Sequence, residues 1–179
     1  HVGKNLAPLV QHDKLAVKYL EAEAPNKLIH TMVERGWLGN KTKVGFYKEH
    51  RQNGSKEFWP LDLQTMEHVA PTKPRFDSVK AAKDLEGLGD RLKVMLEADD
   101  KAAKLVQALT LQSFQYASSI IPEVAGTAKP IDDAMRWGFN WELGPFEMLD
   151  AVGVPEFVKR AESDGVAVPP RLRQVDRFY

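Results

Sequence analysis

One stretch of the sequence decides the fold: Ile131-Asp132-Asp133-Ala134-Met135-Arg136-Trp137-Gly138-Phe139-Asn140-Trp141-Glu142-Leu143-Gly144-Pro145-Phe146-Glu147-Met148-Leu149-Asp150-Ala151-Val152-Gly153. Glycine weakens a helix interior, so Gly138 and Gly144 divide the stretch into a helix, a short connection and a second helix. Pro145 suits the first turn of that second helix, because its fixed φ is already helical. Phe146 and Leu149 are then expected to anchor the helix in the core. We predict helices over 130–138, 144–152 and 154–163.

Helical patterning continues upstream of this stretch. Three segments, at about 77–86, 88–98 and 100–121, carry apolar residues at helical spacing. Asp99 or Asp100 suits the N-cap of the third, because a short acidic side chain can accept the free N–H groups of a first turn. The apolar residues of this third helix cover more than one stripe, which predicts burial between neighbours. They are Ala102, Leu105, Val106, Leu109, Tyr116, Ala117, Ile120 and Ile121.

The first 37 residues also read as helix. A run over 12–24 is expected to end at Pro25, because proline has no amide proton and clashes with the preceding turn. Asn26 can cap the next segment, in which apolar residues return at helical spacing until Gly36.

Residues 43–62 follow a different pattern. Aromatic and branched residues flank Asn53-Gly54, a pair that readily supplies the positive φ angles of a tight turn. We predict a β-hairpin here, and its polar flanks leave the register open. A linker bounded by Pro71 and Pro74 follows. The predicted fold class is mostly α: a helical bundle with one small β-hairpin.

Composition excludes several classes of protein. The chain has 179 residues, and its 25 Lys and Arg balance its 25 Asp and Glu. A neutral balance gives no support for a nucleic-acid partner, and no apolar run is long enough for a membrane span. The chain has no cysteine, which excludes disulfides, thiol nucleophiles and thiolate metal sites. We expect a protein of a reducing compartment, the cytoplasm.

The histidines do not predict a metal site. No two of them form an HxxxH or HExxH pair on one helix. The five are His1, His12, His30, His50 and His68.

Two other motifs fail on their spacing. Gly87-Leu88-Gly89 opens like a dinucleotide loop, but position 92 is a leucine and no strand precedes it, so a helix–helix turn is the better interpretation. Lys41 lies after Gly39-Asn40 but lacks the upstream glycine of a phosphate loop. The serines are outside any GxSxG nucleophile elbow.

Acidic residues gather near predicted helix starts. Asp99-Asp100 and Asp132-Asp133 are explained by the favourable interaction of an acid with the positive end of a helix. Glu142 and Glu147 have no recognisable catalytic partner, so capping or salt-bridging is the better interpretation. The residues alone therefore predict no catalytic, cofactor-binding or metal-binding residue in this chain.

Two segments carry a resemblance to a known family. The first, Arg35-Gly36-Trp37-Leu38-Gly39-Asn40-Lys41-Thr42-Lys43-Val44-Gly45-Phe46-Tyr47, contains G-x-K-T-x-x-G-F-Y. The second, Ile131 to Gly153, contains I-D-x-A-M-x-x-G followed by G-P-F-E-x-x-D-x-x-G. Both resemble the C-terminal helical domain of 3-hydroxyacyl-CoA dehydrogenases, the NAD-dependent enzymes of fatty-acid β-oxidation. The matching residues, expected to be structural, are Gly39, Lys41, Thr42, Gly45, Phe46, Tyr47, Ile131, Asp132, Ala134, Met135, Gly138, Gly144, Pro145, Phe146, Glu147, Asp150 and Gly153.

The order of the two segments implies a tandem repeat. In the family, the G-P-F-E segment precedes the G-F-Y segment, whereas here it follows. The resemblance therefore implies two copies, the first lacking its beginning and the second its end, as in long multifunctional members. An internal repeat agrees: Val2-Gly3, Arg35-Gly36 and Gly45-Phe46-Tyr47 are paralleled by Val152-Gly153, Asp164-Gly165 and Arg177-Phe178-Tyr179. We expect three regions: 1–62, the end of the first copy with its hairpin; 63–98, a linker and connecting helices; and 99–179, the second copy.

The resemblance also implies an activity for the parent protein. That activity is oxidation of a 3-hydroxyacyl-CoA substrate to a 3-ketoacyl-CoA, with hydride transfer to NAD. The Rossmann domain that binds NAD and the catalytic His–Glu pair are expected upstream of His1, so this chain is expected to bind no cofactor. The family's active-site Asn has no counterpart in the 100–121 helix, where Gln107 and Thr110 occupy the neighbourhood. The chain is expected to be inactive alone and to form a substrate-cleft wall and a packing or dimerisation platform.

A second hypothesis makes the chain a non-catalytic interaction module. In single-copy members the helical domains pair two subunits, so a tandem second copy could act as a pseudo-subunit of a multifunctional β-oxidation protein. Its partner surface would then lie largely on the 100–121 helix and the 130–152 region. A homodimer is expected where that apolar surface is unpaired.

Overall fold

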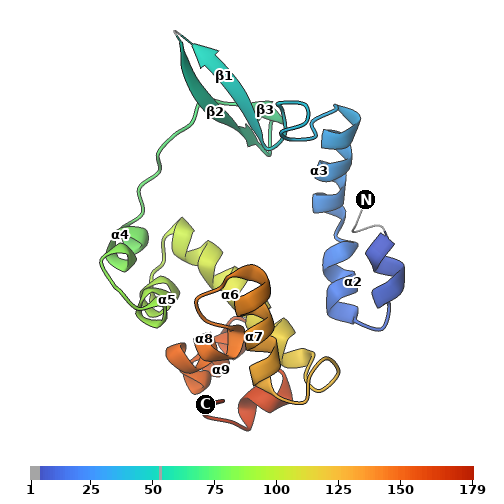
Figure 1. The fold of residues 1–179 in the computed structure, drawn as a ribbon. Coiled ribbons are helices and arrows are strands. Elements are labelled where there is room, and N and C mark those ends of the chain that lie inside the picture. The colour runs from blue at the N-terminus through green and yellow to red at the C-terminus, as the bar shows by residue number, and fades with distance from the viewer. Residues whose placement is uncertain (1–4, 53) are drawn as a thin grey trace. The chain divides into compact units, whose positions relative to one another are not determined.

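The chain forms two compact units, residues 1–73 and 74–179 (Figure 1). The computed structural model describes residues 5–52 and 54–179. Within them lie eight α-helices and a small antiparallel sheet of three strands, and helix accounts for 55% of the structure. The predicted fold class, mostly α with a small hairpin, is confirmed.

The first unit begins with three short helices. They are the 3-10 helix η1 (Ala7–Val10), α2 (Lys14–Leu20) and α3 (Glu23–Glu34). The prediction that Pro25 ends a helix was wrong, because Pro25 lies in the first turn of α3, where no intrahelical acceptor awaits its missing N–H. The prediction that Asn26 caps the next helix was also wrong: its side chain donates to the carbonyl of Leu20, 2.8 Å away.

The predicted hairpin is present, and its register is defined. Strands β1 (Tyr47–Gln52) and β2 (Ser55–Asp62) pair antiparallel from Gln52 opposite Ser55 to Tyr47 opposite Pro60. Gly54 takes a φ of +78° at the turn, and Asn53 lies outside the described residues.

A third strand was not predicted. Strand β3 (Glu67–His68) pairs with β2 after a tight turn in which the Asp62 carboxylate accepts the N–H groups of Gln64 and Thr65. These two hydrogen bonds hold the pKa of Asp62 below its ordinary value. A two-residue strand is too short to give a period in the sequence, so only its turn chemistry could have indicated it.

The second unit is helical throughout. A stretch without helix or strand, 69–76, leads into it, as the two linker prolines predicted. The predicted helices all form, with ends that differ from the prediction by at most three residues, and the 3-10 helix η2 (Pro170–Arg173) was missed. The α-helices are α4 (Asp77–Lys83), α5 (Leu88–Glu97), α6 (Lys101–Ser119), α7 (Ala128–Phe139), α8 (Pro145–Val152) and α9 (Val154–Ser163).

The main core of this unit lies where α6, α8 and α9 meet. Phe114, Phe146, Leu149 and Val154 are fully buried there, and the rings of Phe114 and Phe157 meet edge to face with centroids 5.2 Å apart. Such aromatic pairs add to the hydrophobic burial that anchors these helices. Phe146 and Leu149 thus lie in the core, as predicted.

Helices α4 and α5 fall within the region 63–98 that we expected to connect two copies. In the structure α5 packs against α4, α6 and α8. Gly87 is the N-cap of α5, and a Cβ on Gly89 would lie 2.7 Å from the Cβ of Ala151 in α8. The Gly-Leu-Gly segment therefore starts a helix and permits close helix packing, which confirms the interpretation as a helix–helix turn.

Asp100 is the N-cap of α6 and also holds α4. Its carboxylate accepts the N–H of Ala103 at 2.9 Å, and both the N–H and the hydroxyl of Ser78 at 3.0 and 2.8 Å. The backbone hydrogen bonds lower the pKa of Asp100. Of the two predicted capping candidates, the structure selects Asp100; Asp99 forms an exposed ion pair with Lys104.

The prediction that α6 is buried between its neighbours holds for only part of its surface. Leu105 and Leu109 are 61% and 56% exposed, whereas Ala103, Phe114 and Ala117 are buried. The helix packs against α4, α5 and α8, so its neighbours within the unit cover only part of its circumference. Apolar residues on several sides of a helix indicate that other protein covers them. From the sequence pattern alone, we expected that covering protein to be the neighbouring helices of this unit.

Candidate functional site

The two family-like segments lie in different units. Residues 39–47 belong to the first unit, and residues 131–153 belong to the second. Each segment therefore forms a site of its own.

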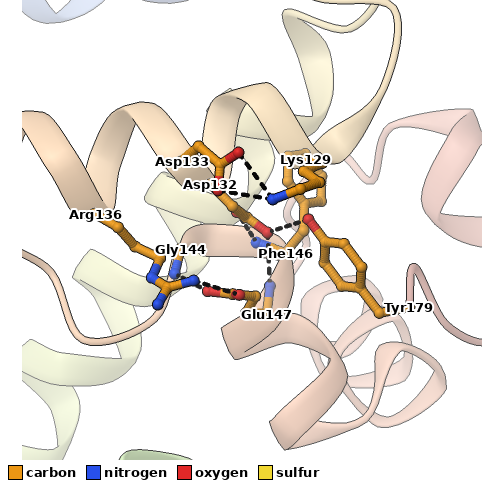
Figure 2. A network of polar contacts seen from close by, with 8 residues as sticks. All are labelled: Lys129, Asp132, Asp133, Arg136, Gly144, Phe146, Glu147 and Tyr179. Carbon is orange, nitrogen blue, oxygen red and sulfur yellow. Dashed lines mark hydrogen bonds and ion pairs between the residues drawn. The ribbon is translucent and has the colours of Figure 1, made fainter.

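The second segment is built around a buried carboxylate, that of Asp132. This residue lies within α7 and is 1% exposed, and its two oxygens accept the N–H groups of Phe146 and Glu147 at 2.8 and 3.1 Å (Figure 2). Those N–H groups belong to the first turn of α8, which has no intrahelical acceptors for them. We predicted that Asp132 complements the start of its own helix; it caps the start of α8 instead.

Gly144 explains why α8 needs an outside cap. It is the N-cap residue, but it has no side chain to accept the N–H groups that follow. A Cβ on Gly144 would collide with the Cα, Cβ and Cγ of Asp132. The glycine therefore makes room for the carboxylate that does the capping.

Glu147 completes the cap from the other side. Its carboxylate accepts the N–H of Gly144 at 2.8 Å and pairs with the Arg136 guanidinium at 3.1 Å. The prediction that Glu147 caps or forms a salt bridge is confirmed on both counts. Asp133 pairs with Lys129 at 2.9 Å along α7, so its carboxylate also has a structural partner (Figure 2).

Asp150 holds a distant part of the chain. Its carboxylate accepts the N–H groups of Phe178 and Tyr179 at 2.8 and 2.9 Å, and Arg177 lies 3.6 Å away. The Phe178 ring packs on Phe146, with centroids 4.6 Å apart. The sequence indicated no role for Phe178 and Tyr179 beyond the internal repeat.

Tyr179 closes the network. Its hydroxyl donates to Asp132 Oδ2 at 2.8 Å (Figure 2). Burial raises the pKa of both groups, and the Asp132 carboxylate further raises that of the Tyr179 hydroxyl. Both carboxylate oxygens of Asp132 are engaged, one by the N–H of Phe146 and the other by the N–H of Glu147 and the Tyr179 hydroxyl. This arrangement fixes a helix start rather than presenting an acid or base to a substrate.

The remaining matching residues of this segment serve α7 and its end. Ile131 is buried in the core, whereas Ala134 and Gly138 are exposed. Helix α7 ends at Asn140, which has a φ of +56° and donates its N–H to the Met135 carbonyl. Gly153 takes a φ of +105° between α8 and α9.

The first segment is a glycine-dependent turn. Gly39 has a φ of +76°, and its N–H donates to the Val44 carbonyl at 2.8 Å. A Cβ on Gly45 would lie 2.8 Å from the Cα of Gly39, so both positions favour glycine. The Thr42 hydroxyl accepts the N–H of Leu38 and donates to the Val44 carbonyl, each at 3.0 Å. The Lys41 side chain is exposed.

Aromatic and basic groups brace this turn. His68 Nε2 lies 2.9 Å from the carbonyl oxygen of Gly45, and the His68 ring meets Trp37 edge to face at 4.9 Å. The Arg35 guanidinium lies 4.9 Å from the centroid of the Trp37 ring and donates to the Met66 carbonyl at 3.1 Å. The sequence did not predict the contacts of His68 with Gly45 and Trp37 or of Arg35 with Met66, because these partners lie more than twenty residues apart.

Helix α6 carries the position at which the family resemblance would call for an active-site Asn. Gln107 is near it, and its amide donates to the carbonyls of Met95, Leu96 and Ala98 at 3.3, 3.0 and 2.7 Å. Arg160 donates to the Leu96 carbonyl as well. The Gln107 amide thus satisfies the C-terminal carbonyls of α5, which have no intrahelical donors.

Among residues 5–52 and 54–179, Gly87 and Gly89 do not form a dinucleotide loop. The three strands form an antiparallel sheet, and Gly87 and Gly89 serve a helix start and a helix contact, so no strand–loop–helix phosphate site is present among them. Nor do residues 5–52 and 54–179 contain a cluster of three or more His, Asp or Glu able to hold a metal ion. Within the same residues, no helix is long and apolar enough to cross a membrane.

Three curated proteins match the chain. A probable 3-hydroxyacyl-CoA dehydrogenase of Bacillus subtilis (strain 168) is 32% identical over 175 residues, which cover 98% of this chain and 21% of the relative. Putative fatty acid oxidation complex trifunctional enzymes of Rickettsia felis and Rickettsia prowazekii are 22% and 24% identical, over 96% and 82% of this chain. The two matches cover 23% and 19% of those relatives. No family model and no solved structure matches the chain.

The names of the curated relatives agree with the resemblance carried by residues 35–47 and 131–153. The chain spans about a fifth of the length of the curated relatives that it matches. The resemblance is confirmed: the chain is homologous to a region of proteins named 3-hydroxyacyl-CoA dehydrogenase and fatty acid oxidation complex trifunctional enzyme.

Proposed function

We propose that the chain is the C-terminal helical region of an NAD-dependent 3-hydroxyacyl-CoA dehydrogenase of fatty-acid β-oxidation. In this role it forms a wall of the substrate cleft and a packing platform, and it supplies no catalytic group. The NAD-binding site and the proton-accepting residue belong to other parts of the parent protein. The parent protein is located in the cytoplasm. The two family-like segments are the G-F-Y end of one helical copy and the G-P-F-E part of a second.

The observation that carries this proposal is the use of polar groups in the second segment. Asp132 caps α8, Glu147 binds Gly144 and Arg136, and Asp150 holds the backbone of residues 178 and 179. A general acid or base needs a free position within hydrogen-bonding reach of the substrate. Carboxylates whose oxygens bind backbone N–H groups support a scaffold role instead.

A chimera tests the proposed function. The region of the Bacillus subtilis relative that matches this chain is replaced by residues 1–179, and acetoacetyl-CoA-dependent oxidation of NADH is compared with that of the unaltered relative. We expect the chimera to keep activity, and a deletion of the same region to lose it. A chimera that folds with the parental circular dichroism spectrum yet shows no turnover would contradict the proposal.

The alternative function is that of a structural interaction module, a pseudo-subunit without chemistry of its own. Exposed apolar side chains on two helices support it: Leu105 and Leu109 on α6, and Trp137 and Phe139 on α7, are 56–80% exposed. Large apolar groups gathered on a surface favour association with a partner.

We expect the isolated chain to self-associate through the exposed side of α6 that carries Leu105 and Leu109. Light scattering over a range of concentrations should give about twice the 20.2 kDa mass of one chain, because closed two-fold dimers are the commonest assembly. Replacing Leu105 and Leu109 together with serine should restore the monomer. Leu9→Ser, at a 74% exposed position in the first unit, is the matched control and should not. A mass of 20.2 kDa at every concentration would exclude the dimer.

A further inference from the structure

Phe46 and Tyr47 are exposed aromatic residues in a segment whose backbone is held in place. Their side chains are 48% and 62% exposed, whereas the preceding Gly45 is buried. The Phe46 carbonyl accepts the N–H of Leu61 at 2.8 Å, and the Tyr47 carbonyl accepts the N–H of Gly45 at 3.0 Å. Within the described part of the chain, the N–H of Phe46 has no acceptor. Two large rings are therefore presented from a fixed backbone.

The second unit shows how the same dipeptide is bound when its partner is present. Phe178 packs its ring on Phe146, in the first turn of α8. The N–H groups of Phe178 and Tyr179 donate to Asp150, and the Tyr179 hydroxyl donates to Asp132, which caps α8. The dipeptide thus recognises a helix that starts with Gly-Pro-Phe-Glu and carries an aspartate five residues after its proline.

A hollow beside Phe46 and Tyr47 has the size and chemistry for such a helix start. Its volume is about 500 Å³, and the Phe58 ring, Lys43, Lys56 and Glu49 also line it. Lys56 pairs with Glu49 at 2.8 Å, whereas no described carboxylate pairs with Lys43. A helix start of the α8 type brings one aromatic ring, which matches the rings of the hollow, and carboxylates, which match the Lys43 ammonium.

We propose that Phe46, Tyr47 and this hollow form a docking surface for a second helix of the Gly-Pro-Phe-Glu type. The sequence contains this motif once, at Gly144–Glu147, and its partner face is already covered by Phe178 and Tyr179. The occupant is therefore a helix from protein outside these 179 residues. The matching relatives are about five times as long as the chain, so they have room for one.

A tethered copy of the helix tests the proposal. Residues 128–153, which hold α7, α8 and Gly153, are duplicated ahead of residue 1. Tethering compensates for a small interface by raising the effective concentration of the helix. By nuclear magnetic resonance, we expect contacts between the added Phe and Phe46, and amide exchange at Phe46 slower by about tenfold or more.

Matched variants separate docking from general stabilisation. F146A in the added copy should abolish the slowed exchange, whereas F139A in the added copy should leave it, because Phe139 is 70% exposed in α7. An added copy that is helical by its own signals, with Phe46 and Tyr47 unchanged, would overturn the proposal.

A second experiment decides the case in which the added copy does not form a helix. The Phe178→Ser and Tyr179→Ser chain presents α8 in its own unit with the partner face free, and it is mixed with the unaltered chain labelled for resonance. Shifts at Phe46 and Tyr47 of the labelled chain support the proposal, and their absence contradicts it. Equal shifts caused by the unaltered chain would make a second copy of this chain the occupant and overturn the assignment to an outside helix.

Discussion

Phe146→Ala is expected to destabilise the second unit by about 3–5 kcal/mol, the usual cost of emptying a fully buried aromatic site. The Phe146 ring is 0% exposed and packs on Phe178 with centroids 4.6 Å apart. Truncation leaves a cavity between α8 and the residues that follow η2, and it removes the ring against which Phe178 rests. Urea unfolding followed by circular dichroism measures the loss as a shift of the midpoint at constant slope.

Phe139→Ala is the matched control for this prediction. It removes the same atoms five residues before Gly144, from a side chain that is 70% exposed. Its effect should stay within about 0.5 kcal/mol, as for most surface substitutions. Equal stability of the Phe146→Ala protein and the unaltered chain would show that the ring does not anchor α8.

Asp132→Ala is expected to cost about 2–4 kcal/mol, because it removes an N-cap and leaves buried donors without an acceptor. The donors are the N–H groups of Phe146 and Glu147 and the Tyr179 hydroxyl. Asp133→Ala is the control, because Asp133 pairs with the Lys129 ammonium along α7 rather than with the first turn of α8, and it should cost less than Asp132→Ala. Similar losses for the two variants would argue against capping across helices.

The pH dependence of Asp132→Asn gives an independent check. Burial raises the pKa of Asp132 above its ordinary value of 3.8 in the folded chain. Folding therefore favours the protonated carboxyl, and the contribution of this group to stability falls as the pH rises from 3.8 through the folded pKa. Asparagine does not titrate. The advantage of the unaltered chain over Asp132→Asn should narrow as the pH rises above 3.8, and a constant advantage would contradict the raised pKa.

Helices were predictable here because their signals are local. Gly144, Pro145 and the spacing of Phe146 and Leu149 define α8 within eight residues of sequence. The local signal of Pro25 led to a wrong prediction. Proline is unfavourable in a helix interior but suits a first turn, and only the true start of α3 distinguishes these two positions.

The polar network was only partly predictable. Asp132 was assigned to a helix start because acids are common there, but its partner helix begins thirteen residues later and meets it through tertiary packing. One sequence signal did exist, because a glycine N-cap cannot cap its own helix and an acceptor must come from elsewhere. Tyr179, forty-seven residues from Asp132, has no such signal.

The exposed side of α6 was also only partly predictable, because a local sequence pattern does not identify a tertiary contact. The spacing of Leu105 and Leu109 shows that these residues favour an apolar neighbour, but not which chain or unit provides it. The structure leaves both side chains more than half exposed. The sequence thus indicates a partner surface only indirectly: the helix carries more apolar residues than its own unit can bury.

Incubating the isolated 179-residue chain with acetoacetyl-CoA and NADH tests most directly whether the region is a scaffold without a catalytic group. Its carboxylates bind backbone N–H groups and its Gln107 amide binds the end of α5, so we predict no NADH oxidation above the rate without protein. Acetoacetyl-CoA-dependent oxidation of NADH in proportion to the concentration of the chain would contradict the account.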